Sequence, residues 1–308
     1  MNPTTKAYSG IIILTISWGT IPLIIRTSDI AAISLVGIRT FLGTLFLAVL
    51  LIRKDFNIKE LIKPGLILGP LLAIHWVTMF ESIELNSIAV GIGLVFSYPL
   101  FVLLIEFLRG NKPKSYQVFL ILIGFLGLYY LLDISNIASL EGAFYGLISA
   151  ISLSLIITIG ERFSSQLGGL KVAFSQLLVA SIILFKFTYE AREWLIDNIA
   201  VSVFLGFFLT GVGLTTYWYV VKIIKPIAVS TISYLEPVTG VVIGAFLLNE
   251  TLTSKQLIGF ILVLLVGVGQ IYLTLELLEP QKFDSLCKNG CLALSIFQNS
   301  IVSVFQSI

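Results

Sequence analysis

The sequence has little charge. Only 12% of its 308 residues are Asp, Glu, Lys or Arg, whereas 57% are hydrophobic. Soluble domains usually carry about 25% charged residues, so a soluble chain of this composition would have no place for its apolar surface. The net charge of +2 and the lack of basic stretches interleaved with aromatic residues argue against a nucleic-acid partner. The composition therefore indicates a chain that lies in a lipid bilayer.

Histidine and cysteine, the usual metal ligands, are scarce. His75 is the only histidine, and Cys287 and Cys291 are the only cysteines. No further Cys or His lies near the two thiols to complete a zinc site, so we expect two unpaired thiols, no metal centre and no cofactor. An HExxH motif is absent, and no Asp pair or Ser/His pair lies deep in two helices. These absences argue against an intramembrane enzyme.

Long apolar runs are what the chain has instead. A helix needs about 20 apolar residues to cross a bilayer core. Runs of this kind are Tyr8–Ile25, Ala31–Ile52, Pro64–Phe80, Ser87–Leu108, Tyr116–Leu132, Gly142–Ile159, Leu170–Phe187, Ile199–Val221, Pro226–Leu248 and Gln256–Leu278. The sequence thus predicts an all-α integral membrane protein of ten transmembrane helices. Pro64 and Pro226 are expected at helix starts, where a missing N–H costs nothing.

The Lys and Arg residues predict the orientation. With a cytoplasmic N-terminus, fourteen of them lie on the cytoplasmic side, four lie outside, and Arg39 lies within a span. Positive residues favour the cytoplasmic side. We therefore expect a multi-pass protein of the cell (inner) membrane, with both termini cytoplasmic.

Two stretches of the chain resemble each other. Ser87-Ile88-Ala89-Val90, Ser97-Tyr98-Pro99, Gln117 and Gly127 are echoed in order by Pro226-Ile227-Ala228-Val229, Leu235-Glu236-Pro237, Gln256 and Gly267. This predicts two five-helix halves, residues 1–135 and 136–279. Because five is odd, the halves must face opposite ways across the membrane. Inverted repeats are typical of transporters, whose substrate site lies near the midplane between the halves.

Residues 280–308 fall outside the repeat. Phe297, Ile301, Phe305 and Ile308 recur at helical spacing. The segment is too short and polar for a confident span. It predicts a cytoplasmic tail that is either an interfacial amphipathic helix or a loose end.

Ionisable groups deep in lipid are costly and are candidates for function. Glu236 lies about 16 Å into its helix, and Pro237 frees a backbone carbonyl one turn earlier. Glu236 is therefore expected in a cavity, where it could be reversibly protonated; the alternative is a packing carboxyl with a partner. His75 is expected either in the cavity or in an interhelical hydrogen bond. Arg39 could meet a carboxylate substrate, but pairing with a carboxyl such as that of Glu236 is preferred. Glu106 is expected to reach the interface.

Aromatic residues recur at middle depth, where an interfacial belt does not explain them. They are Trp18, Trp76, Tyr98, Tyr217, Trp218 and Tyr234. We expect them to form a pocket that stacks on an apolar or aromatic substrate. Gly240 and Gly244 form a GxxxG pair suited to close helix packing.

The stretches Ile92–Leu108 and Ile232–Gly267 resemble the paired modules of EamA-type carriers in the drug/metabolite transporter superfamily. The second is the closer match, with Tyr234-Leu235-Glu236-Pro237-Val238, Leu247-Leu248-Asn249-Glu250 and Gln256-Leu257-Ile258-Gly259; Trp18-Gly19 also fits. The resemblance covers roughly residues 8–278. It departs at Gly110-Asn111, where the family usually has Gly-Glu. It implies ten helices in two inverted halves around a central cavity.

We therefore expect a secondary transporter that exports amino acids or related metabolites by alternating access. A second interpretation is an uptake or exchange carrier for a nucleotide-like or S-adenosylmethionine-like substrate. A membrane enzyme or a scaffold is the alternative of another class. The expected partners are a small-molecule metabolite and the lipid bilayer, with protons as a candidate coupling ion, a homodimer as a candidate assembly and no nucleic acid.

Overall fold

The computed structural model describes residues 3–52, 57–86, 88–132, 137–239, 242 and 253–278, and the regular elements in these ranges are all helices. They are α1 (Pro3–Trp18), α2 (Ile21–Thr27), α3 (Ala32–Leu51), α4 (Ile58–Leu85), α5 (Ile88–Val95), α6 (Tyr98–Leu108), α7 (Ser115–Leu132), α8 (Leu140–Leu167), α9 (Gly169–Ile183), α10 (Phe185–Glu190), α11 (Arg192–Asp197), α12 (Ile199–Val203), η1 (Phe204–Val212), α13 (Gly213–Ile224), α14 (Pro226–Ile232) and α16 (Ser254–Leu278).

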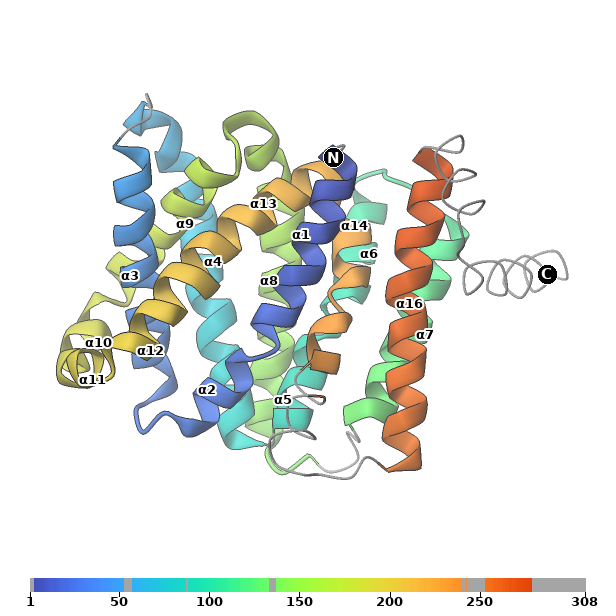
Figure 1. Cartoon of the computed structure of the whole chain (residues 1–308), viewed down its shortest axis with the longest axis horizontal. Coiled ribbons are helices and arrows are strands. Elements are labelled where there is room, and N and C mark those ends of the chain that lie inside the picture. The colour runs from blue at the N-terminus through green and yellow to red at the C-terminus, as the bar shows by residue number, and fades with distance from the viewer. Residues whose placement is uncertain are drawn as a thin grey trace, which may run out of the picture.

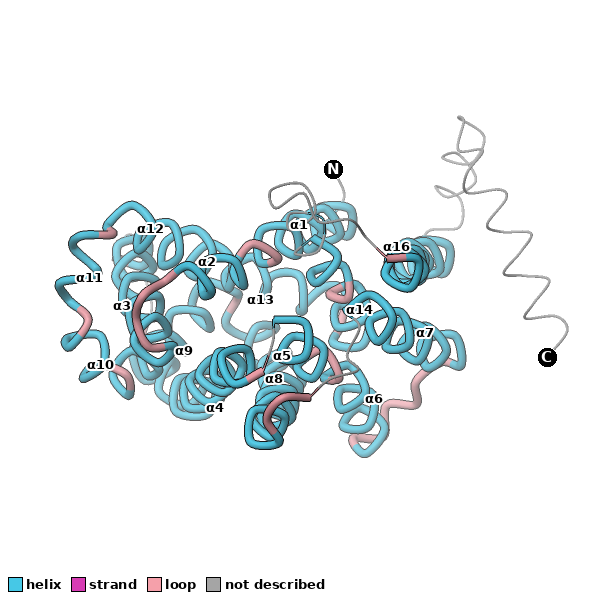
Figure 2. The backbone as a smooth tube through the Cα atoms, turned by 90° about the horizontal axis from the view of Figure 1, so that it is seen from below, coloured by secondary structure: helices cyan, strands magenta, loops and turns pink. Residues whose placement is uncertain are grey.

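The helices form one bundle whose long members run roughly side by side (Figure 1). Helix α4 packs along α8 and α9, α3 packs along α9 and η1, and α1 packs along α13. Seen end-on, α7 and α16 lie together at one edge, and α10 and α11 lie at the opposite edge (Figure 2). The start of α1 and the α6–α7 and α13–α14 connections lie at one end of the bundle, whereas α2 and the start of α5 lie at the other (Figure 1).

Within the described residues, eight helical segments are long and apolar enough to cross a membrane. They match eight of the ten predicted runs. The run Leu170–Phe187 corresponds to a shorter apolar helix, Gly169–Ile183, followed by the short helices α10 to α12. The run Pro226–Leu248 is helical over 226–232 and 235–239, and most of its remainder lies outside the described residues. So do Gly240, Gly244, Cys287, Cys291 and the predicted tail at 280–308.

The prediction for Pro64 was wrong. Helix α4 begins at Ile58, and Pro64 and Pro70 lie inside it. The start is fixed by Asn57, whose side chain accepts a hydrogen bond from the Lys59 amide at 3.0 Å, as a helix N-cap does. Pro226, by contrast, does stand at the first position of α14, as predicted.

Three interrupted helical runs in the described part of the chain share one feature. Helix α1 ends at Trp18 before α2, α5 ends at Val95 before α6, and α14 ends at Ile232 before helix resumes at residue 235. Each restart carries a proline within its first three residues: Pro22, Pro99 and Pro237. Proline suits the first turn of a helix because its missing N–H would have no partner there. Broken helices leave backbone groups unpaired, and at membrane depth this is tolerated where they line a cavity.

Glycines allow the closest helix contacts. A Cβ atom on Gly19 would lie 2.7 Å from the backbone oxygen of Glu236, so the α1–α2 break fits directly against the helix that carries Glu236. A Cβ atom on Gly160 in α8 would overlap the six-membered part of the buried Trp218 ring. Small residues at such positions let helices approach in a membrane bundle.

We expect Gly160→Ala to destabilise the bundle. Overpacking costs about 1–3 kcal/mol, and the helix propensity gained by alanine, about 1 kcal/mol, offsets only part of it. Gly10→Ala is the matched control, because its Cβ would make ordinary contacts of 3.4 Å with Thr216 and Val220. Melting midpoints of the detergent-purified proteins should fall for Gly160→Ala and not for Gly10→Ala. Equal midpoints would contradict the packing described.

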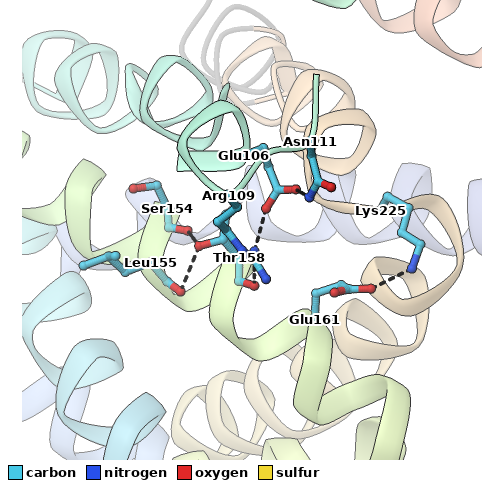
Figure 3. Close-up of polar contacts among 8 residues, drawn as sticks. All are labelled: Glu106, Arg109, Asn111, Ser154, Leu155, Thr158, Glu161 and Lys225. Carbon is cyan, nitrogen blue, oxygen red and sulfur yellow. Dashed lines mark hydrogen bonds and ion pairs between the residues drawn. The ribbon is translucent and has the colours of Figure 1, made fainter. Parts of the chain in front are cut away.

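A polar cluster joins α6 and the connection that follows it to α8, near the end of the bundle where α1 begins (Figure 3). Arg109 donates from Nη1 to Glu106 Oε1 at 2.6 Å and to the Thr158 carbonyl on α8 at 2.8 Å. Asn111 donates to the other oxygen of Glu106 at 2.6 Å. Glu106 was predicted to reach the interface, but its side chain is only 8% exposed, because these two donors hold it inside. The Arg109 bond links the two predicted halves.

A second ion pair lies beside the first. Lys225, between α13 and α14, contacts Glu161 Oε1 on α8 at 2.6 Å (Figure 3). The Lys225 side chain is 64% exposed, against 22% for Arg109, whereas both carboxylates are largely buried. The two ion pairs thus differ mainly in the exposure of their cation.

Removing one partner of each pair should have unequal effects. Arg109→Gln leaves the Glu106 carboxylate buried with one donor fewer, and the loss of stability should lie at the lower end of about 3–5 kcal/mol, since Arg109 is partly exposed. Lys225→Gln removes an exposed partner and should cost about 0–1 kcal/mol. Thermal unfolding of both variants in the same detergent measures the difference. Equal losses would mean that burial does not set the strength of these pairs.

Candidate substrate cavity

A cavity lies at the level of the three helix breaks. It encloses about 670 Å³ of space between atoms, including the part open to its surroundings. Its wall is built from α1 to α4, the α5–α6 break, α8, α13 and the interruption after α14. Eight of the nine residues predicted for a cavity or its ion pair line it: Trp18, Arg39, His75, Trp76, Tyr98, Tyr217, Trp218 and Glu236.

Tyr234 does not line this cavity, contrary to the prediction. Its ring packs against Gly124 on α7, and its hydroxyl donates to the Ile121 carbonyl at 3.3 Å. Glu236 faces the cavity, whereas Tyr234, in the interruption before it, faces α7.

Arg39 on α3 is the charged group held most tightly in the wall. The residue is 1% exposed. Its Nε donates to Thr210 Oγ1 at 3.0 Å, and its guanidinium carbon lies 3.8 Å from the centre of the Trp76 ring. Among the ion pairs of the described residues there is none between Arg39 and Glu236. The two groups face the same cavity without touching, so the predicted direct pair is absent from this conformation.

His75 on α4 both lines the cavity and forms an interhelical hydrogen bond, the two alternatives that the sequence left open. It lines the cavity, and its Nδ1 lies 2.7 Å from Ser149 Oγ and 3.2 Å from the Ser149 carbonyl on α8. The Ser149 hydroxyl donates to the His75 carbonyl at 2.9 Å, so it can only accept from Nδ1. Nδ1 therefore carries a hydrogen, and in the neutral ring Nε2 is left as an acceptor.

The tryptophan rings are anchored at their polar ends. Trp18 donates from Nε1 to the Leu209 carbonyl at 2.7 Å, and Trp218 donates to Gln176 Oε1 at 3.0 Å. Tyr217 lies between them, with ring centres 5.5 Å from Trp18 and 5.6 Å from Trp218. A buried aromatic with its polar atom bonded keeps a fixed position. The cavity therefore has a preformed apolar wall.

Glu236 lies where this cavity meets a second one of about 400 Å³. Ile21, Met79 and Phe96 also line both. The second cavity is lined further by Pro22 and Ile25 of α2 and Ile92 of α5, at the end of the bundle away from the Arg109 cluster (Figure 1). The two cavities together lead from the helix breaks towards that end.

Several wall residues were missed by sequence reasoning. They include Ile21, Leu72, Met79, Phe96, Leu153, Ile156, Leu214 and Ser233. Most are apolar and indistinguishable by type from lipid-facing residues. The prolines Pro22, Pro99 and Pro237 were the available signal, because each follows a helix break that borders the cavities.

The described residues contain no group of three or more His, Cys, Asp or Glu side chains placed to hold a metal ion.

Comparison with known proteins agrees with the two-part organisation. The EamA-like transporter family matches residues 5–132 and again residues 140–271. A transporter of Archaeoglobus fulgidus is 24% identical over 83% of this chain and 93% of its own length. The Escherichia coli inner membrane transporter YedA is 28% identical over 81% of this chain and 85% of its own. YvbV, a transporter of Bacillus subtilis, is 23% identical over 74% of this chain and 78% of its own.

A solved crystal structure shares the fold. It has a TM-score of 0.66 and 16% sequence identity, and the match covers 86% of this chain and 96% of the other. The two consecutive family matches cover most of the chain. The described helices in these ranges include segments long enough to span a membrane. The chain is a multi-pass membrane protein, a transporter and not an enzyme, and it belongs to the EamA-like transporter family.

Proposed function

We propose that the protein is a secondary transporter that exports amino acids or related small metabolites by alternating access. The observation that carries this proposal is the cavity, which combines a guanidinium, a carboxyl group and anchored aromatic rings among the helix breaks. Binding sites of this kind are mostly apolar with a few placed polar groups. Transporters with inverted repeats place such sites between their halves, at broken helices.

The proposal includes the architecture in which the cavity works. Ten transmembrane helices form two inverted five-helix halves, residues 1–135 and 136–279, followed by a cytoplasmic tail. The similarity to YedA, an inner membrane transporter, supports placement in the inner membrane. The Lys and Arg distribution supports cytoplasmic termini. In that orientation the two cavities lead outwards, and the Arg109 cluster lies at the cytoplasmic end.

Flux measurements test the transport function directly. Purified protein in liposomes should move at least one labelled compound from a panel of amino acids and nucleotides, in exchange for the same unlabelled compound. Oriented vesicles then distinguish export from uptake or exchange. A protein that is folded and inserted but moves no compound of the panel would contradict the proposed substrate class.

Glu236→Gln separates two roles for this carboxyl. If Glu236 carries a proton through the cycle, the variant keeps substrate binding but its flux no longer changes with pH. If Glu236 only contacts substrate, affinity falls and any pH dependence remains. Initial rates between about pH 5 and 8, with the amount of protein per vesicle as control, measure both. Wild-type flux and affinity at every pH would make Glu236 a packing residue.

A further inference from the structure

The two cavities lead towards one end of the bundle, where α2 and the start of α5 lie. At the other end are the contacts of Arg109 and Lys225 with α8, and neither of these two residues lines a cavity. A transporter that works by alternating access exposes its site to each side in turn. The end that carries Arg109 and Lys225 must therefore open in a second conformation.

Two cations hold the same turn of α8. Arg109, at the end of α6, donates from Nη1 to the Thr158 carbonyl at 2.8 Å. Lys225, between α13 and α14, contacts Glu161 Oε1 at 2.6 Å (Figure 3). Residues 158 and 161 lie about one turn apart on α8. Helices α6 and α14 each border a helix break in the cavity wall, so these contacts tie wall segments from both family-matched parts of the chain to α8.

Lys225 has a backbone conformation that suits glycine. Its φ is 75° and its ψ is 156°, and it is the one non-glycine residue with positive φ in the described part of the chain. Gly168 joins α8 to α9 with nearly the same angles, φ 83° and ψ 158°. A residue with a side chain is strained at such angles, and it stays there only where its surroundings hold it. The ion pair with Glu161 provides such a hold.

Both contacts can break without leaving an unpaired charge in the interior. When Arg109 leaves the Thr158 carbonyl, its Nη1 still lies 2.6 Å from Glu106 Oε1. The Lys225 side chain is 64% exposed, and water that enters as this end opens solvates Glu161. Breaking a buried pair is strongly unfavourable when it leaves an uncompensated charge, and neither contact does so. Both therefore suit a closure that opens repeatedly.

Resting on the proposed function, we propose that the Arg109–Thr158 and Lys225–Glu161 contacts are the latch of a gate at this end of the cavity, with the Lys225 backbone as its hinge. Opening breaks both contacts. The α13–α14 corner then turns and Lys225 leaves its strained conformation, because hinge residues absorb the φ and ψ changes of such a motion. The strain favours the open gate, and the two contacts favour the closed one.

The accessibility of a cavity residue tests the gate without any substrate. Ser233→Cys introduces a thiol of nearly the same size into the cavity wall, in a background that carries Cys287→Ser and Cys291→Ser. A membrane-impermeant methanethiosulfonate is added to vesicles from the side that faces the α6–α7 connection, which labelling of Lys112→Cys identifies. The modification rate of Ser233→Cys then measures how often the gate is open.

Loss of either contact should raise this rate. Arg109→Gln removes a charge-assisted hydrogen bond and should raise it at least about tenfold. Lys225→Gln and Glu161→Gln each remove a partly exposed ion pair and should raise it about two- to fivefold. Lys186→Gln is the matched control, because Lys186 pairs with Glu190 within the single helix α10, and it should leave the rate unchanged.

Lys225→Gly separates the hinge from the latch. Like Lys225→Gln it removes the ion pair, but glycine adopts the angles of this corner without strain. Because the strain favours opening, Ser233→Cys should be modified about fivefold more slowly with Lys225→Gly than with Lys225→Gln. An equal or faster rate with Lys225→Gly would show that this corner is not the hinge.

The variants of the Lys225 pair decide the matter if Arg109→Gln does not fold, since loss of an exposed pair affects stability little. Wild-type rates in Lys225→Gln and Glu161→Gln overturn the latch. The expected rates without flux of any compound would overturn the proposed function and leave the gate standing. Flux with unchanged rates would overturn the gate and leave the proposed function.

Discussion

The burial of the Arg39 guanidinium is the constraint around which this bundle is arranged. A positive charge near the middle of a membrane protein must be given partners by several helices at once. Here α3 carries the charge, α4 covers it with Trp76, and η1 supplies the Thr210 hydroxyl. The opposite charge, Glu236, stands on a segment much later in the chain. Arg39 and Glu236 both face the cavity without forming a direct ion pair. This arrangement requires the surrounding helices to pack against one another while leaving the cavity open.

The helix breaks meet that requirement. Where α1, α5 and α14 end, a proline lies within the first three residues of the next segment. Each break would be unfavourable if it faced lipid, because its backbone groups would lack partners. Gly19 brings one break against the backbone of Glu236, so two interrupted segments support each other. The interruptions are thus placed by packing as well as by the proline residues themselves.

Sequence reasoning grouped several cavity residues correctly but could not give the direction in which each side chain points. Rise per residue predicts middle depth for Trp18, Trp76 and Glu236, and the structure brings their side chains to one cavity. Direction depends on which neighbour each face meets, and the sequence does not contain that information for Tyr234 or for the apolar Phe96. The sequence also did not reveal that Glu106 is buried. Asn111 donates a hydrogen bond to its carboxylate and helps to keep it inside the protein.

Helix η1 has a consequence for how the cavity could change shape. It is a π-helix, in which hydrogen bonds span five residues instead of four. Its consecutive residues Leu209 and Thr210 bind Trp18 and Arg39, two walls of the cavity. If η1 tightened to an α-helix, the residues beyond the change would turn by about 100° relative to those before it. The positions of the Trp18 indole and the Arg39 guanidinium therefore both depend on the number of residues per turn in η1.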